Sequence, residues 1–343
     1  MKVLLKDVAR VAGVSASTAS LALNDKPSIS SNTKEKVLLA AKKLNYRPHI
    51  IAKQLALGRT NSVICFVIPS QKTTNIVPSS WGFYYLIIQG IQDILSAHNY
   101  RFLLEIRTME NIEREKTLLN FARESSVEGA FFLLQVKDDY GDIFKLKSMG
   151  FPIVVINANI WEQVSSVCVD YINVAQRVME YLILLGHQKV AFISGSLNYF
   201  SALEILPAFK EIVYESRLKV KKQWIVEGDW TIDSGYECAG RILEVGMPTA
   251  IFCGNDHMAA GAMRRIKETG LLIPEDISVM GFDDSAIAKV TIPPLSSVRQ
   301  PLYRIGELAG KELIRLMGEK QIDARKILLE TEIVKRQSCR AIK

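Results

Sequence analysis

The sequence lacks any apolar segment that would place it in or across a membrane. No run approaches the roughly 18 consecutive apolar residues that a transmembrane helix needs. Near the N-terminus, charges at Lys6, Asp7 and Arg10 interrupt the apolar core of about 7 or more residues that a secretory signal requires. We therefore expect a protein that spans no membrane and works in the cytoplasm.

Cysteine and histidine are also scarce and scattered. The 343 residues include five cysteines and four histidines, and no cysteine pair has the short spacing of metal ligands. Most of the cysteines stand inside apolar runs such as VICFVI and AIFCG, which is typical of buried, reduced thiols. The sequence therefore predicts no metal site and no cofactor.

Signatures of catalysis are missing as well. The segment GSLNYFS lacks the glycines of a dinucleotide-binding turn, and neither a Walker A sequence nor a G-x-S-x-G elbow is present. Asp283 and Asp284 are adjacent, but neighbouring side chains of a strand point to opposite faces, which argues against a carboxylate dyad. We therefore do not expect an enzyme.

What the sequence does hold is positive charge at one end. Residues 1–60 contain eleven Lys and Arg against three Asp and Glu, a net charge of +8, whereas the whole chain carries +7. Residues 61–343 therefore carry −1. Such asymmetry is typical of a segment that binds a polyanion, although a basic stretch taken alone is also consistent with a solvated face.

The same N-terminal segment has the pattern of a helix-turn-helix. The run KDVARVAGVSASTASLALN predicts one helix that ends at Gly13, suited to a left-handed helix stop, and a second that begins after Ser15 as N-cap. A third helix is expected after Ser30. The second helix carries small polar side chains and no acid, so it can approach phosphates and base edges. A generic small helical domain is the alternative.

From residue 61 onward, strand patterns alternate with helix patterns, which predicts an α/β core of two doubly wound parallel-sheet lobes. The expected boundaries place about 61–160 and 292–322 in lobe one and about 161–291 and 323–343 in lobe two, with ILLETEIVKR as a single last strand. Ligands bind such sheets at the carboxyl ends of the strands. The polar and aromatic residues just past those ends are Phe83, Tyr84, Asn157, Asp170, Tyr199, Ser201, Trp230, Asn255, Asp256 and Asp283.

The N-terminal segment resembles the headpiece of LacI/GalR (lactose-repressor) family regulators, through LKDVARVAGVSASTASLALN and YRPHIIAKQLALGRTNS. The resemblance implies an all-α helix-turn-helix DNA-binding domain at 1–47 and a hinge helix with linker at 48–60. In that family the second helix enters the major groove, and the hinge helices push a leucine into the minor groove. The resemblance thus places base-edge contacts at Ala16, Ser17 and Leu21, backbone or flanking-base contacts at Ser15, Thr18, Ser20 and Asn24, and hinge contacts at Ala52, Lys53 and the wedge Leu55.

Residues 61–343 resemble the effector-binding core of the same family, which is similar to periplasmic sugar-binding proteins. The similarity lies in LGHQKVAFISG, GDWTIDSGY, IFCGNDHMAAGAMR, IPEDISVMGFDDS and TIPPLSSVRQP. It implies that Trp230 packs on a ring-shaped effector and that Asn255 and Asp283 hydrogen-bond it. A core position for Trp230, a structural role for Asp283 and helix capping by Asp256 are the alternatives.

Two departures from the family pattern concern the effector. Ile205 stands where the family often has an arginine, so a familiar sugar cannot be assumed. The loop at 70–82, which brings Trp81 with it, is either a lid or an exposed insertion.

Together these patterns predict a sequence-specific DNA-binding transcriptional regulator. The resemblance makes it a repressor, whose affinity for a near-palindromic operator depends on a small molecule, such as a sugar, bound between two lobes. A homodimer would match the symmetry of such a site, and the helix from Phe83 to His98 is a candidate dimer face. The rival hypothesis is a solute-binding receptor without a role on DNA, against which the basic headpiece counts.

Overall fold

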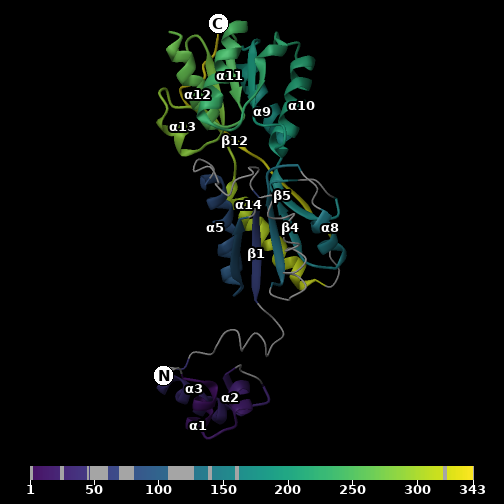
Figure 1. Ribbon diagram of the computed structural model, residues 1–343, viewed down its shortest axis with the longest axis vertical. Helices are drawn as coiled ribbons and strands as arrows, with labels where there is room; N and C mark the ends of the chain where they lie inside the picture. The colour runs from purple at the N-terminus through teal and green to yellow at the C-terminus, as the bar shows by residue number, and fades with distance from the viewer. Residues whose placement is uncertain are drawn as a thin grey trace. The chain divides into compact units, whose positions relative to one another are not determined.

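The computed structural model describes residues 3–23, 27–44, 46, 61–68, 81–106, 127–137, 141–158, 162–319 and 323–342. The chain divides into two compact units, residues 1–60 and residues 61–343 (Figure 1).

The first unit contains three short helices, α1 (Leu5–Ala12), α2 (Ala16–Leu23) and α3 (Ser31–Lys43). Each contributes apolar side chains to one small core. Its fully buried members include Val8, Ala19 and Val37. The core therefore draws on all three helices, as the predicted helix-turn-helix requires.

Local backbone chemistry sets the limits of these helices. Gly13 follows α1 with a φ of 67°, a left-handed conformation that glycine adopts without strain. The Ser15 hydroxyl accepts a hydrogen bond from the Thr18 backbone N–H at 3.0 Å, and Ser30 caps α3 by accepting from the Thr33 N–H at 3.3 Å. The predicted turn and caps are confirmed.

The second unit is built on two sheets, each of six strands among the described residues. The first sheet has the order β11-β5-β4-β3-β1-β2, with all pairs parallel. Its inner strands are continuous apolar runs such as GAFFLL, as expected for strands buried on both faces, whereas the two edge strands are partly exposed. The strand bounds are β1 (Ser62–Ile68), β2 (Arg101–Ile106), β3 (Gly129–Leu134), β4 (Ile153–Ile156), β5 (Ser165–Val169) and β11 (Lys326–Leu329), and the described helices of this lobe are α5 (Trp81–Ala97), α8 (Gly141–Ser148) and α14 (Leu302–Gly318).

The second sheet has the order β12-β10-β9-β8-β6-β7, parallel except for the antiparallel pair of β10 and β12. Figure 1 shows its helices gathered in one lobe and α5, α8 and α14 in the other. The strands are β6 (Val190–Ser194), β7 (Ile225–Glu227), β8 (Ala250–Cys253), β9 (Ser278–Asp283), β10 (Ser296–Arg299) and β12 (Glu332–Val334), and the helices are α9 (Tyr171–Leu184), α10 (Phe200–Glu215), α11 (Ile232–Val245), α12 (Asp256–Glu268) and α13 (Ala286–Val290).

The expected lobe boundaries need correction. The strand β5 at 165–169 belongs to the first sheet, β10 at 296–299 belongs to the second, and ILLETEIVKR forms two strands, β11 in the first sheet and β12 in the second. The chain therefore crosses between lobes three times, after β5, after β10 and after β11. A short apolar run predicts a buried strand, but it does not say which of two equally apolar sheets will receive it.

The helices α5 and α14 pack in close contact beside the first sheet. A Cβ atom added at Gly90 would lie 2.2 Å from the Tyr303 carbonyl oxygen, so only glycine allows this approach. Ile87, Ile91 and Leu95 of α5 are fully buried in the same core. This packing fixes the N-terminal end of α5, where Phe83 lies.

Candidate functional site

A cavity of about 520 Å³ lies in the second unit, at the carboxyl ends of strands from both sheets. Residues that follow β3 and β4 meet residues that follow β6, β7, β8, β9 and β10. This is the edge at which open α/β sheets bind ligands. Its lining comprises Gly82, Phe83, Leu86, Gln135, Asn157, Tyr171, Tyr199, Ser201, Asp229, Trp230, Thr231, Gly254, Asn255, His257, Phe282, Asp283, Asp284, Ser285, Ala286, Ile287, Gln300 and Leu302.

Most of the residues predicted to contact an effector line this cavity. They are Phe83, Tyr199, Ser201, Trp230, Asn255 and Asp283, and Asn157 joins them. Tyr84 does not, and that prediction is wrong. It is 1% exposed and packs in the core, because successive helix positions differ by about 100° and only Phe83 points to the cavity side. Asp170 also stays outside, since its carboxylate caps α9 by accepting from the Asn173 N–H at 3.0 Å.

Trp230 presents its indole to the cavity from a strained backbone position. Its φ is 74°, and its ring centroid lies 4.8 Å from that of Tyr199. The ring covers Gly195, where an added Cβ would come within 1.9 Å of the indole. The buried indole N–H has no hydrogen-bond partner among the described residues. An aromatic ring therefore adjoins the cavity.

Asn255 and Asp256 have distinct roles at the start of α12. Asn255 is the helix cap, because its Oδ1 accepts from the Met258 N–H at 2.8 Å, while its amide donates to the Trp230 carbonyl at 3.0 Å. Capping by Asp256, one of the alternatives, is therefore wrong. Asn255 thus joins the helix start to the backbone that carries the indole.

Asp283 ends β9 with a φ of 109° and accepts from the Gln300 amide nitrogen at 2.7 Å. Burial raises the pKa of this carboxyl well above its usual range, and the nearby charge of Asp256 raises it further. The Gln300 carbonyl oxygen is buried without a hydrogen-bond partner among the described residues. Asp283 and Gln300 thus form a hydrogen-bonded carboxyl–amide pair in the cavity lining.

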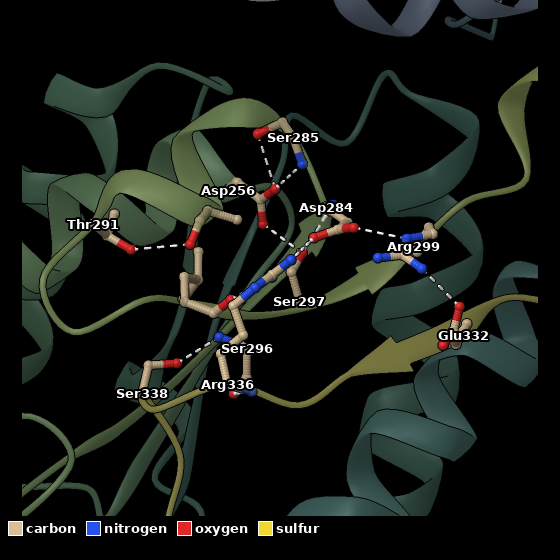
Figure 2. A network of polar contacts seen from close by, with 12 residues as sticks. Asp256, Asp284, Ser285, Thr291, Ser296, Ser297, Arg299, Glu332, Arg336 and Ser338 are labelled. Carbon is tan, nitrogen blue, oxygen red and sulfur yellow. Dashed lines mark hydrogen bonds and ion pairs between the residues drawn. The ribbon is translucent and has the colours of Figure 1, made fainter.

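Beneath this wall, Asp256 is fully buried and organises the turn after β9 (Figure 2). Its carboxylate accepts from the Ser285 backbone N–H at 2.7 Å, the Ser285 hydroxyl at 2.9 Å and the Ser297 hydroxyl at 2.5 Å. Burial raises the pKa of Asp256 to about 6, although these hydrogen bonds oppose the shift. The three bonds fix the segment that follows Asp283.

Asp284 is held by two arginines (Figure 2). It accepts from Arg299 Nε at 2.7 Å and from Arg336 Nη2 at 2.5 Å, and Arg299 also donates to Glu332 at 3.0 Å. Arg299 is the last residue of β10 and Glu332 the first of β12, so both stand next to a crossing between the lobes. The network therefore links the cavity wall to two of the three crossings.

The two lobes also pair directly through backbone groups. Val136 and Tyr199 form an antiparallel bridge, flanked by hydrogen bonds from Lys137 N–H to the Asn198 carbonyl (2.7 Å) and from Phe200 N–H to the Gln135 carbonyl (2.9 Å). Gln135 and Tyr199 line the cavity. We call this pairing of 135–137 with 198–200 the interlobe ladder.

Residues that the sequence did not single out complete the lining. Tyr171 donates to Asn157 Oδ1 at 2.5 Å, which holds the amide at the cavity wall. Gln300 was missed because the strand before it was assigned to the other lobe. Had the crossing after β10 been recognised, the residue that follows Arg299 would have been a candidate.

In the first unit, α2 has one exposed face. Ala16, Ser17 and Leu21, the predicted base-edge contacts, are exposed, whereas Ala19 and Ala22 are buried against the other helices. Ser15, Thr18 and Ser20 lie beside this face, with the Ser15 hydroxyl 2.8 Å from those of Ser17 and Thr18. The predicted DNA contacts at Asn24, Ala52, Lys53 and Leu55 lie outside the described residues, as do residues 70–80 of the loop predicted at 70–82, whose last two residues, Trp81 and Gly82, instead begin α5.

Residues 4–49 match the family described as bacterial regulatory proteins, lacI family, and residues 179–339 match a periplasmic binding protein-like domain. The chain is 34% identical to catabolite control protein A of Priestia megaterium, over 98% of this chain and 99% of that protein. It is 31% identical to the probable HTH-type transcriptional repressor ExuR of Bacillus subtilis (strain 168), over 99% of each. The chain belongs to the lacI family.

Solved structures agree with this assignment. The lac repressor dimer bound to operator and the anti-inducer ONPF has a TM-score of 0.84 at 28% identity, covering 99% of this chain and 100% of that one. The transcriptional regulator CelR in complex with cellobiose has a TM-score of 0.71 at 28% identity, with coverages of 98% and 100%. This member of the lacI family is thus a DNA-binding transcriptional regulator and not an enzyme. No helix in the described part of the chain has the length and apolarity to span a membrane.

Proposed function

We propose that this lacI-family regulator is a repressor whose hold on an operator is controlled by a small molecule in the cavity of its second unit. The observation that carries the proposal is the convergence of strand ends from two lobes on one cavity, in a chain that also exposes Ala16, Ser17 and Leu21 on a basic headpiece. These three side chains contact base edges, with Ser15, Thr18 and Ser20 on the phosphates beside them.

The same proposal assigns roles within the cavity. Trp230 and Tyr199 pack against a ring, Asp283 and Gln300 hydrogen-bond its substituents, and Ser201 contributes a hydroxyl. The cellobiose bound by the similar regulator CelR supports a saccharide-like effector. Buried amides and hydroxyls that hydrogen-bond a ligand discriminate strongly against analogues that lack the partner group.

We further propose that the protein acts as a homodimer on a near-palindromic operator, in the cytoplasm where that DNA lies. The similar lac repressor was solved as a dimer on its operator. On α5, Tyr85 is 60% exposed, which leaves apolar area for a second copy. Asn24, Ala52, Lys53 and Leu55 are proposed as further DNA contacts, with Leu55 the minor-groove wedge.

The test is selection of duplexes from a random pool by the full-length protein at about physiological salt. A recovered palindrome, whose binding weakens steeply as salt rises, is expected, because phosphate contacts release counterions. The selected duplex is then titrated in the presence of candidate saccharides, with Trp230→Ala as the cavity variant. Recovery of no motif, with or without ligands present, would contradict the operator-reading function.

A further inference from the structure

Charge is distributed unevenly in the cavity. Its lining includes the carboxylates of Asp229, Asp283 and Asp284, and no lysine or arginine belongs to the described lining. Burial lowers the pKa of His257 below 6.5, so this imidazole is neutral at pH 7. Every full charge that the described side chains can bring to the cavity is therefore negative.

The nearest guanidinium groups are already committed. Arg299 and Arg336 both bind Asp284, whose side chain is only 4% exposed. Asp229 accepts from the N–H and hydroxyl of Thr231, at 3.0 and 2.6 Å, and Asp283 accepts from an uncharged amide. Because the two arginines neutralise Asp284, the carboxyl groups of Asp229 and Asp283 remain without a countercharge among the described residues.

Helix N-termini are the other source of positive potential at this edge. The first turns of α11 and α12 are closed by their own caps, since Thr231 accepts from the Ser234 N–H at 3.1 Å and Asn255 accepts from the Met258 N–H. The starts of α10, behind Tyr199, and of α14, at Leu302, have no side-chain cap, and neither does the five-residue α13 at Ser285. Each open start of a longer helix contributes about half a unit of positive charge, so the starts of α10 and α14 together offset about one of the two remaining carboxyl groups and leave no full positive charge to pair with an anion.

We propose that this cavity selects its ligand by charge. It accepts a hydrogen-bonding, ring-shaped compound that is uncharged or carries a positively charged nitrogen, and it rejects compounds with carboxylate, phosphate or sulfate groups. The regulatory role of this ligand rests on the proposed function, whereas the charge selection rests on the cavity alone. Moving an ion out of water costs several kcal/mol unless a countercharge replaces the lost hydration.

The protonation of Asp283 also favours an uncharged or cationic ligand over an anion. Burial and Asp256 raise the pKa of Asp283, and an anion bound beside it would raise that pKa further. A protonated Asp283 donates a single hydrogen bond to an anion but supplies no countercharge. A ligand ammonium group instead supplies one, and the faces of Trp230 and Tyr199 also attract cations.

The test measures the potential inside the cavity without requiring knowledge of the ligand. Ser201→Cys places a reporter thiol in the lining of the full-length protein, whose five native cysteines are buried. Its reaction rates are measured with two thiosulfonate reagents of similar size, one carrying trimethylammonium and the other sulfonate. Ser216→Cys is the matched control, because Ser216 is exposed and caps the opposite, electronegative end of the same helix α10.

We expect the ratio of cationic to anionic rates to be at least about tenfold higher at position 201 than at position 216, because a unit charge acting over a separation of about 7 Å contributes on the order of 2 kcal/mol at an effective dielectric of 20. The native chain, treated in parallel, gives the background rate. Ala286→Cys, at an exposed position in the same lining, repeats the measurement should Ser201→Cys fold poorly. A ratio inside the cavity equal to or below that at position 216 overturns the proposal.

The two proposals fail separately. A cavity that favours the cationic reagent in a protein that recovers no operator would retain the charge selection and refute the proposed function. An operator-binding protein whose operator is released by a uronate or a sugar phosphate, with that release abolished by Trp230→Ala, would retain the function and refute the charge selection.

Discussion

Replacing Asp256 with asparagine (Asp256→Asn) would keep an acceptor oxygen for the donors of Ser285 and Ser297 and remove the negative charge. Burial raises the pKa of the Asp256 carboxyl from 3.8 to about 6. A pKa that is higher in the folded than in the unfolded state means that the folded state binds the proton more tightly. The stability that this proton contributes is complete below about pH 4 and is lost as the pH rises through about 6.

The magnitude follows from the two pKa values. Between pH 5 and pH 8, proton release from Asp256 lowers the free energy of unfolding of the wild-type protein by about 1.4 kcal/mol. Asp256→Asn has no such proton to release. Its stability relative to wild type should therefore rise by about 1.4 kcal/mol over this range. Asp256→Ala also leaves the Ser285 N–H unpaired, which costs about 1–3 kcal/mol at either pH.

Urea unfolding followed by tryptophan fluorescence measures this difference. All four tryptophans, Trp81, Trp161, Trp224 and Trp230, belong to residues 61–343, so the signal reports on the core and not on the headpiece. The exposed Asp233, changed to asparagine, is the control and should shift equally at both pH values. If the difference between Asp256→Asn and wild type is the same at pH 5 and pH 8, the folded protein does not bind the Asp256 proton more tightly than the unfolded chain does.

Ser17→Asp adds a negative charge to the exposed face of α2, so binding to all duplexes should weaken by tenfold or more in filter or anisotropy titrations, and unchanged affinity would remove α2 from the interface. Gly90→Ala should destabilise the core by about 1–3 kcal/mol in thermal unfolding, because its Cβ would lie 2.2 Å from a backbone oxygen of α14. Gly82→Ala, with open space around its Cβ, should cost far less, and equal losses would contradict the close packing. Lys137→Pro removes the N–H that binds the Asn198 carbonyl in the interlobe ladder. This hydrogen bond contributes about 1 kcal/mol, so its loss should speed ligand dissociation about fivefold in stopped-flow fluorescence. An unchanged rate would show that the interlobe ladder does not hold the cavity closed.

Much of the candidate site could be predicted because polar residues stand directly after buried strands. Trp230, Asn255 and Asp283 each follow such a run, and parallel strands bring their carboxyl ends to one edge. The helix-turn-helix was equally accessible, since Gly13 and Ser15 mark its turn through local backbone chemistry alone.

The parts of the fold and the site that were not predicted depend on pairings between distant segments, which local sequence patterns do not encode. Tyr84 was misplaced because the sequence does not fix the rotation of α5 about its axis, whereas packing against α14 does. Gln300 and the lobe boundaries required knowing which sheet receives β5, β10 and β11. The role of Asp256 was inaccessible for a similar reason, because its partners Ser285 and Ser297 lie far along the chain.

The three crossings have a consequence for synthesis on the ribosome. Each sheet receives its last described edge strand from one short stretch, β11 for the first and β12 for the second, within residues 326–334. Until that stretch emerges, β5 and β10 are open edges whose unpaired backbone groups invite pairing with other chains. Neither lobe can mature ahead of the other, although the headpiece can fold as soon as it is made. The nascent regulator is thus an early DNA-binding unit attached to a late-maturing core, and the final strands complete both halves of that core together.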